Sequence, residues 1–543
     1  MFNKYLNNQK NQLTLLVLVT FLCYINVTQN GYSLDDHFVT TAEHPLVSKG
    51  LSGIKDIFTS NYSTYQGKGF EYRPLTVFLY AIEYQLFGFN PALSHFINLL
   101  LYLFLLVQVY FVLQKLLPLK NEEIFWIILV FALHPLHNEV VVSLKNREEI
   151  LVAIFGFLSF KYLFTYLQNS NTKALIASFV FFLVGSFAKV TISPFAFLIV
   201  FSAWYFKKGS FKKLTAVFFT YFLISQLFYW TAYAFLSNGL TRTFDVIENP
   251  LVEISFLNRI PTAFSVLFFY VKLFIWPNPL LSYYGLGSIQ ISNWYSPSFF
   301  AGLSILLLIA IIFIRELKKR SLFGYGIFIF TFLISTYLNF PVLAPGVIAE
   351  RFMFTAVLGF AIILVTTLNK YLSPKYFYIV IITTTSIYVF LNITRTPNWK
   401  SLSSLLEADT NKEITSVKLV TAYAENYHSV AANETSDVNL RENYFRKAQE
   451  GYLKVINLYP KHGGAYNNLG TLYASIGKLK EAETCLLKAI ELGFILADSY
   501  FNLAAIYEIA GKYNLAKKYY FKCLELNPDY VQAKERLTIL KNY

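Results

Sequence analysis

The residues AYNNLGTLYASIGKLKEA (465–482) and SYFNLAAIYEIAGKYNLA (499–516) repeat one pattern at a fixed spacing near the end of the chain. Identical residues recur 34 positions apart: Tyr466 and Tyr500, Asn468 and Asn502, Leu469 and Leu503, Tyr473 and Tyr507, Gly477 and Gly511, Ala482 and Ala516. Leu458, Leu492 and Leu526 keep the same step. A period of this length predicts stacked helical units, because each unit leaves an apolar face that its neighbour must cover.

The repeated residues resemble the tetratricopeptide repeat, in which small residues let paired helices pack closely and aromatic residues fill the gaps. We expect residues 423–543 to form this repeat domain. It would contain two clear repeats, a degenerate one over about 423–457, and a capping helix over Val531–Tyr543. Residues 396–422 are expected to be a linker.

Residues 1–395 are predicted to be a many-pass membrane domain. The whole chain is 55% hydrophobic and only 14% charged, whereas soluble proteins average about 25% charged residues. Apolar runs approach the roughly 20 residues that cross a bilayer as a helix. The fold class is therefore all-α. We expect about eleven spans, near 11–28, 92–114, 124–140, 150–167, 174–188, 191–206, 215–236, 298–314, 323–339, 352–368 and 376–393.

Cations predict the orientation of these spans, since Lys and Arg gather in cytoplasmic loops. The N-terminal run 13–27 reads as a retained signal anchor whose preceding end is cytoplasmic. A single crossing at 258–290 would place the basic stretch 315–320 outside, so that segment is predicted to be re-entrant, interfacial or a double pass. The chain would leave the membrane outside near Arg395, with the repeats extracytoplasmic. The net charge of +14 is thus explained by loops, and no nucleic-acid partner is expected.

With this orientation, ionisable residues gather at the outer membrane face. They are Asp35, Asp36, Arg73, His95, His134, His137, Glu139, Arg147, Lys189, Glu350 and Arg351. A carboxylate can take the proton of an attacking hydroxyl, and a neighbouring acid can raise its pKa. Arginine matches phosphate oxygens and stabilises charge on a leaving phosphate. Together these groups indicate group transfer from a phosphate-linked donor.

Each signal also has a plainer interpretation. An acidic pair in a loop is often a solvated turn or a helix cap. Arg73 and Arg351 could be interfacial anchors, and His134 and His137 could hydrogen-bond between helices. A divalent metal held by these histidines and acids is possible, but the spacing does not indicate one. Cys23, Cys485 and Cys523 have no metal-ligand spacing either.

A set of motifs in order along the chain resembles the transmembrane-and-tetratricopeptide-repeat (TMTC) family of O-mannosyltransferases. The motifs are Asp35-Asp36, Tyr72-Arg73-Pro74-Leu75-Thr76, Asn90-Pro91 with His95 and Asn98, His134-Pro135-Leu136-His137-Asn138-Glu139 with Arg147, Ala349-Glu350-Arg351, and Arg395 with Trp399. The resemblance implies a GT-C membrane glycosyltransferase that uses a lipid-phosphate-linked sugar and an acidic residue of the first outer loop, here about residues 29–91.

The resemblance implies roles for matching residues only. Asp35 and Asp36 would be the catalytic acids, with Asp35 the first choice for the base. Arg73, Arg147, Arg351 and Lys189 would hold the donor phosphate, supported by His95, His134, His137, Glu139 and Glu350. The family commonly has an acid after this lysine, whereas Val190 stands here, which leaves the role of Lys189 in doubt. The donor sugar, mannose or another hexose on a polyprenyl or dolichyl phosphate, is not specified by these motifs.

The predicted enzyme would sit in a bacterial inner membrane, or in the ER membrane of a eukaryote, and modify a hydroxyl of a protein or glycan. Its repeat groove would bind a protein partner or present the acceptor. The main alternative is a non-enzymatic scaffold anchored in the membrane, which needs neither many spans nor a polar cluster. A transporter would place charges near the bilayer midplane and show inverted repeats, which the sequence lacks.

Overall fold

The computed structural model describes residues 8–40, 44–61, 63–65, 68–235, 244–340, 342–433 and 437–540. It divides into two compact units. The first comprises Met1–Ser282 and Ile291–Leu405, and the second comprises Tyr283–Gln290 and Leu406–Tyr543. The all-α fold class is confirmed in both.

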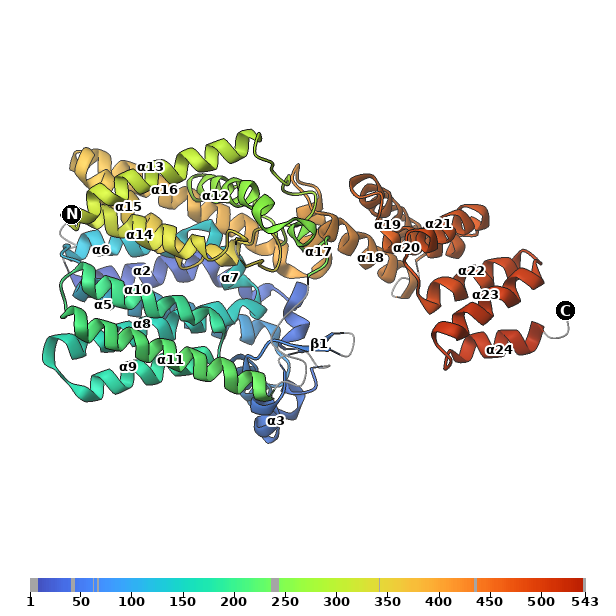
Figure 1. Ribbon diagram of the computed structural model, residues 1–543, viewed down its shortest axis with the longest axis horizontal. Coiled ribbons are helices and arrows are strands. Elements are labelled where there is room, and N and C mark those ends of the chain that lie inside the picture. Colours follow the sequence, from blue (N-terminus) through green and yellow to red (C-terminus); the bar gives the residue numbers. More distant parts are fainter. Residues whose placement is uncertain are drawn as a thin grey trace. The chain divides into compact units, whose positions relative to one another are not determined.

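The first unit is a bundle of apolar helices that run side by side (Figure 1). Its principal helices are α2 (Gln9–Tyr24), α5 (Pro91–Leu116), α6 (Asn121–Leu133), α8 (Arg147–Asn169), α9 (Thr172–Ser186), α10 (Ser193–Tyr205), α11 (Phe211–Phe235), α12 (Ile260–Ile275), α13 (Pro297–Lys319), α14 (Leu322–Ser335), α15 (Ala356–Tyr371) and α16 (Pro374–Arg395).

Short elements follow one another at one end of this bundle, the end at which α3, α7 and β1 lie in Figure 1. They are η1 (Ile25–Gln29), η2 (Leu34–Phe38), η3 (Val47–Gly53), α3 (Ile54–Thr59), α4 (Pro74–Phe87), η4 (Pro135–His137), α7 (Asn138–Val142), η5 (Leu144–Asn146), η6 (Val190–Ile192), η7 (Pro250–Glu253), η8 (Phe256–Arg259), η9 (Glu350–Met353) and η10 (Thr396–Lys400). Strands β1 (Ser63–Tyr65) and β2 (Lys68–Phe70) pair antiparallel. We call this end of the bundle the polar end.

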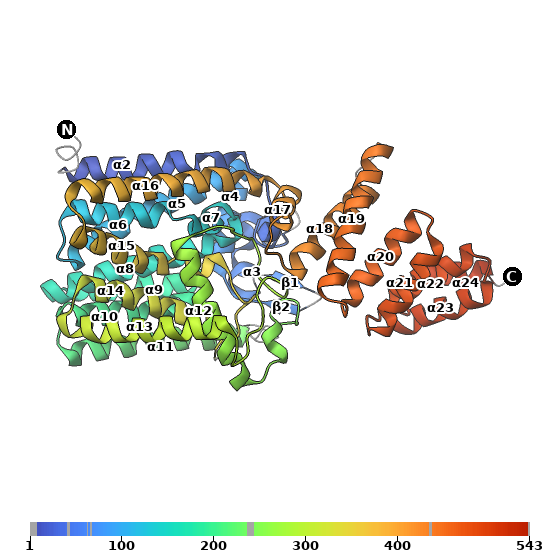
Figure 2. The same ribbon diagram turned by 90° about the horizontal axis from the view of Figure 1, so that it is seen from above.

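The opposite end of the bundle carries the start of α2 (Figure 2). Lys115, Lys120, Lys370 and Lys375 stand in the chain where α5 ends, α6 begins, α15 ends and α16 begins. The side-chain amide of Gln9, at the start of α2, donates to Gln114 Oε1 near the end of α5 at 3.2 Å. Asn369, near the end of α15, donates to Glu123 Oε1 at the start of α6 at 2.6 Å. The start of α2 therefore lies beside the end of α5, and the end of α15 beside the start of α6. We call this the basic end.

Seven stretches within the described residues are long and apolar enough to cross a membrane: Gln9–Gln29, Pro91–Leu116, Leu144–Asn169, Phe211–Ala234, Phe256–Ile275, Pro297–Lys319 and Pro374–Lys400. An eighth is the pair Asn121–Leu133 and Pro135–Val142, bent by 54°. The bend follows from Pro135, which cannot donate the backbone hydrogen bond that would continue α6. Four further apolar helices, α9, α10, α14 and α15, have 10–17 residues, so the predicted count of about eleven spans is not confirmed.

The segment 258–290 contains one helix, α12, followed by a loop that returns toward the start of that helix. The hydroxyl oxygen of Ser265 in α12 lies 2.7 Å from Ser292 Oγ and 2.9 Å from Ser298 Oγ. Close approach of the α12 and α13 backbones requires Gly302, because an added Cβ would lie 1.9 Å from the carbonyl oxygen of Phe264. The segment thus starts and finishes at one end of the bundle, although Phe256–Ile275 is itself apolar enough to cross.

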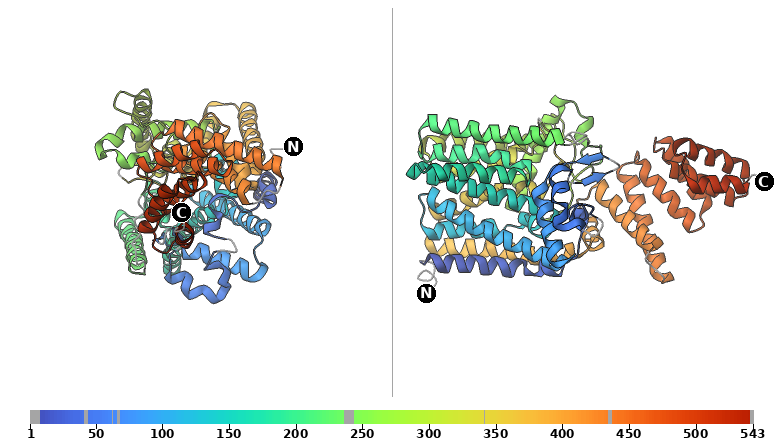
Figure 3. Two further views of the ribbon diagram at one scale, coloured as in Figure 1. Left: turned by 90° about the vertical axis from the view of Figure 1, so that its right-hand side faces the viewer. Right: turned by 90° about the horizontal axis from the view of Figure 1, so that it is seen from below.

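The second unit is built from helix pairs (Figure 3). Its helices are α18 (Val417–Asn433), α19 (Val438–Leu458), α20 (Gly463–Ser475), α21 (Leu479–Glu491), α22 (Ala497–Ile509), α23 (Tyr513–Leu526) and α24 (Val531–Leu540). The repeated leucine Leu503 and the alanines Ala482 and Ala516 are buried between them. The expected linker 396–422 contains η10, α17 (Leu402–Thr410) and the start of α18.

Residues 283–290 of the α12–α13 loop pack with the second unit. The backbone N–H of Val417 donates to the carbonyl oxygen of Leu286 at 2.8 Å. The ammonium group of Lys418 lies 4.5 Å from the ring centre of Tyr283. Residues 283–290 therefore belong to the same compact unit as α18.

Candidate active site

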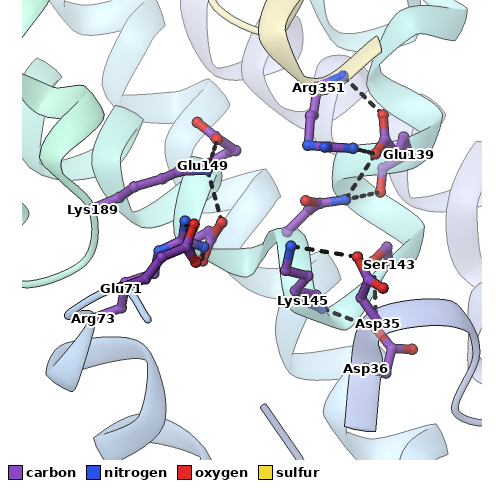
Figure 4. Close-up of polar contacts among 12 residues, drawn as sticks. Asp35, Asp36, Glu71, Arg73, Glu139, Ser143, Lys145, Glu149, Lys189 and Arg351 are labelled. Atoms are coloured by element: carbon purple, nitrogen blue, oxygen red, sulfur yellow. Dashed lines mark hydrogen bonds and ion pairs between the residues drawn. The ribbon is translucent and has the colours of Figure 1, made fainter. Parts of the chain in front are cut away.

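Asp36 is a buried carboxylate that ties the first loop to the turn before α8. Its oxygens accept hydrogen bonds from the backbone N–H groups of Ser33 and Lys145, both at 3.0 Å, and from Ser143 Oγ at 3.4 Å. Its side chain has no exposed surface. Burial raises the pKa of Asp36 to about 7, against the opposing effect of these donors. We therefore assign Asp36 a positioning role, in which it holds η2 against η5 (Figure 4).

Asp35, its neighbour, is partly exposed instead. Its side chain is 42% exposed, and one carboxylate oxygen lies 3.5 Å from the ammonium group of Lys145. An acceptor hydroxyl can reach this carboxylate without unfolding the loop. Of the two predicted acids, Asp35 has the accessibility that a general base needs.

Glu139 and Arg351 form a second, deeper contact between α7 and η9. One Glu139 oxygen accepts from the guanidinium of Arg351 at 2.7 Å, and the other accepts from the Arg351 backbone N–H at 2.9 Å. Asn146 donates to the same carboxylate at 3.3 Å. Burial alone would lower the pKa of Arg351, but the adjacent carboxylate of Glu139 raises it. The pair fixes Arg351 as a cation at the polar end.

A third group of charges surrounds Arg73 and Lys189. Arg73, which directly precedes α4, pairs with Glu71 at 2.7 Å and with Glu148. Lys189, which precedes η6, pairs with Glu148 at 2.8 Å and with Glu149. Lys189 therefore does find acidic partners, supplied by α8 rather than by the residue that follows it.

A small cavity borders both this third group and the Glu139–Arg351 contact. Its lining includes Glu149, Arg351, Tyr337 and Thr355. The cavity volume is about 20 Å³, which holds about one water molecule. A sugar phosphate can enter this space only if side chains around it move.

Arg147 lies apart from these contacts. It is completely buried, pairs with Glu83 of α4, and donates to the carbonyl oxygen of Ser94 at 2.8 Å. Its guanidinium carbon also lies 4.1 Å from the ring centre of Tyr80. The side chain predicted to hold a phosphate is thus already surrounded by protein partners, which suits a structural role joining α4, α5 and α8.

The three histidines also lie in the interior rather than in the charged cluster. His134 hydrogen-bonds to the carbonyl oxygen of Phe274 at 3.1 Å, and His137 to that of Phe354 at 3.0 Å. His95 lies 3.2 Å from the carbonyl oxygen of Gly31. The carboxylate of Glu350 accepts the backbone N–H of Leu281 at 2.7 Å. Each of these side chains therefore joins two segments of the chain.

No group of three or more histidine, cysteine, aspartate or glutamate side chains that could hold a metal ion occurs among the described residues. The carboxylates Glu139, Glu148 and Glu149 are instead matched with Arg351, Arg73 and Lys189. A donor phosphate would therefore have to compete with carboxylates that already hold the cations.

Lys145, Ser143, Glu148 and Glu149 are members of the cluster that the sequence did not assign. The signal was present, because residues 145–149 read Lys-Asn-Arg-Glu-Glu and a membrane helix rarely begins with so many charges. What the pattern could not show was which of them meet Asp35, Asp36, Arg73 or Lys189, since those partners come from distant loops.

Two family models of the tetratricopeptide repeat match residues 452–484 and 497–530. Among curated proteins, the chain is 28% identical to human protein O-mannosyl-transferase TMTC1 over 153 residues, which are 27% of this chain. It is 28% identical to human TMTC3 over 158 residues and 33% identical to human TMTC4 over 129 residues, or 28% and 21% of this chain. The resemblance to TMTC proteins is confirmed, but the chain covers only 17% of the length of these relatives.

A solved structure, that of a thermophilic tetratricopeptide-repeat protein from Thermus thermophilus, is 16% identical. It covers 44% of this chain and 99% of its own, with a TM-score of 0.22. That score is too low to bear on the fold.

Proposed function

We propose that this protein is a membrane glycosyltransferase that moves a sugar, mannose or another hexose, from a polyprenyl-phosphate donor to a hydroxyl group at the polar end of the bundle. The observation that carries the proposal is Asp35, a partly exposed carboxylate set beside Lys145 and anchored through its neighbour Asp36. The names of the relatives, protein O-mannosyl-transferases, support the same reaction class.

The transfer is a single displacement at the anomeric carbon of the sugar. The acceptor hydroxyl attacks that carbon, and its proton passes to the carboxylate of Asp35. The bond from the anomeric carbon to the phosphate oxygen breaks, and its electron pair leaves with the polyprenyl phosphate. The configuration at the anomeric carbon is inverted.

Cations at the polar end stabilise the departing phosphate. Arg351 lines the small cavity, and its side chain is 13% exposed, so it is the residue that a phosphate reaches after a modest opening. Arg73 and Lys189 act from the other side, each shared with Glu148. Arg147 and the histidines support the site by holding the helices that carry it.

The acceptor is a protein or glycan on the extracytoplasmic side, and the repeat unit binds it or a partner protein. Tetratricopeptide arrays offer extended grooves for such ligands. The scaffold alternative uses the repeats alone and leaves the charged contacts of the first unit without a function.

The test is sugar transfer by the full chain in proteoliposomes that contain radiolabelled mannosyl-phosphoryl-polyprenol and a membrane-protein extract. Asp35→Asn removes the base and should lower incorporation into protein by about 10²–10⁴-fold. Its melting temperature should stay that of the unchanged protein, because the Asp35 side chain is 42% exposed.

The matched control is Asp56→Asn. Asp56 is an exposed acid in α3 of the same loop region, paired with Lys49 at 2.6 Å. It should leave transfer unchanged. Transfer at the normal rate by Asp35→Asn would refute the role of Asp35. If the unchanged protein transfers no sugar from any polyprenyl-phosphate hexose, the glycosyltransferase proposal fails and the scaffold alternative stands.

A further inference from the structure

An apolar groove lies at the basic end of the first unit, far along the helices from Asp35. It is lined by Phe197, Val200, Phe201 and Trp204 of α10 and by Phe211, Leu214, Thr215 and Phe218 of α11. Spacings of three and four residues put each set on one face of its helix. The cavity volume is about 230 Å³, and the seven helical rises from residue 197 to residue 204 give it a length of about 10 Å.

The walls of this groove are held by packing behind them. The ring of Phe201 stacks on Phe328 of α14 with centroids 3.6 Å apart. Arg320, directly after α13, donates to the carbonyl oxygens of Trp204 and Tyr205 at 2.9 and 3.1 Å. Its guanidinium carbon lies 5.0 Å from the ring centre of Trp204. Contacts from Phe328 of α14 and from Arg320 therefore hold the α10 wall of the groove in place.

Positive charge surrounds the mouth of the groove. Lys207 and Lys208 stand in the turn between α10 and α11, and Lys212 and Lys213 follow in the first turn of α11. Arg320 adds a fifth cation beside Trp204. Within the described residues none of the four lysines has a carboxylate partner. Glu316, near the end of α13, is shared by Arg315 and Lys319 at 3.2 and 3.5 Å.

We propose that this groove binds one acyl chain of an anionic glycerophospholipid, whose phosphate headgroup is held by the four lysines in the α10–α11 turn and the first turn of α11. An apolar groove facing the bilayer suits a hydrocarbon chain. Basic residues at the membrane surface select lipids with net negative headgroups over zwitterionic ones. The site is separate from the sugar-transfer chemistry, and its test does not depend on that activity.

The experiment reconstitutes the full chain in nanodiscs of equal phosphatidylglycerol and phosphatidylcholine and counts retained lipids by native mass spectrometry. The unchanged protein should retain phosphatidylglycerol at least about tenfold over phosphatidylcholine. The reason is that each lysine near the membrane surface adds a favourable electrostatic interaction with an anionic headgroup. The double variant Lys212→Gln/Lys213→Gln should lower this preference by at least about threefold. Lys207 and Lys208 remain to preserve the orientation of the helices.

Two variants separate the groove from general surface charge. Val200→Trp fills the groove and should lower retention of both lipids. Leu223→Trp should not, because Leu223 of α11 lies outside the groove and is 63% exposed. Lys370→Gln/Lys375→Gln removes two exposed charges at the same end and should leave the preference intact. Equal retention of the two lipids by the unchanged protein would overturn the proposal. An equal loss of the phosphatidylglycerol preference in the two lysine double variants would also overturn it. That comparison can be made even if Val200→Trp fails to fold.

Discussion

Removing Glu139 should destabilise the membrane unit more than removing any surface acid. Its carboxylate is 2% exposed and accepts from the Arg351 backbone N–H, the Arg351 guanidinium and Asn146. These contacts join α7 to η9, which are more than 200 positions apart in the sequence. Glu139→Ala leaves the guanidinium of Arg351 without its counter-charge in a mostly buried site.

The magnitude follows from the geometry of the pair. Removing one partner of a buried ion pair lowers the free energy of unfolding by about 3–5 kcal/mol, because the remaining charge is uncompensated. Replacing both partners, as Glu139→Leu/Arg351→Met, removes both charges and leaves one buried backbone N–H, that of Arg351, at a cost of about 1–3 kcal/mol. The double variant should therefore be more stable than Glu139→Ala.

The assay is unfolding in mixed micelles with increasing sodium dodecyl sulfate, followed by the fluorescence of the six tryptophans. The surface pair Lys49–Asp56, with side chains 50% and 47% exposed, supplies the control, and Asp56→Ala should not move the unfolding midpoint. If Glu139→Ala unfolds at the midpoint of the unchanged protein, or if the double variant is the least stable, the carboxylate does not hold the site together.

Two further predictions concern protonation and packing. Because folded Asp36 keeps its proton to about pH 7 and the unfolded chain releases it near pH 3.8, the folded state binds more protons between these values. Stability should fall by up to about 4 kcal/mol as pH rises from 4 to 7 and be flat above that range, and melting curves of Asp36→Asn should lack this slope. At the α14–α15 crossing, a Cβ on Gly359 would lie 2.4 Å from the Phe330 backbone nitrogen. Gly359→Ala should therefore cost about 1–3 kcal/mol, whereas Leu308→Ala on the exposed face of α13 should cost less; equal melting temperatures would contradict this packing.

The sequence alone determined the class of each part of the chain, because the signals are local or periodic. A 34-residue repeat of Leu, Tyr, Gly and Ala predicts stacked helix pairs, and α20–α23 form such pairs. Alternating apolar runs and basic turns predict a membrane bundle with its ionisable residues at one end. Asp36, Glu139, Arg351 and Lys189 do lie at the polar end.

Only the tertiary structure decided what each of those residues contacts. Asp35 and Asp36 are adjacent and chemically identical, yet one is 42% exposed and the other is buried under Ser33, Ser143 and Lys145. Likewise, Arg147 and Arg351 read alike in sequence, but Arg147 is enclosed by Glu83 and Tyr80 while Arg351 lines a cavity. The physical reason is that a side chain's charge state and access depend on partners from distant elements, which helix packing brings together and no local pattern encodes.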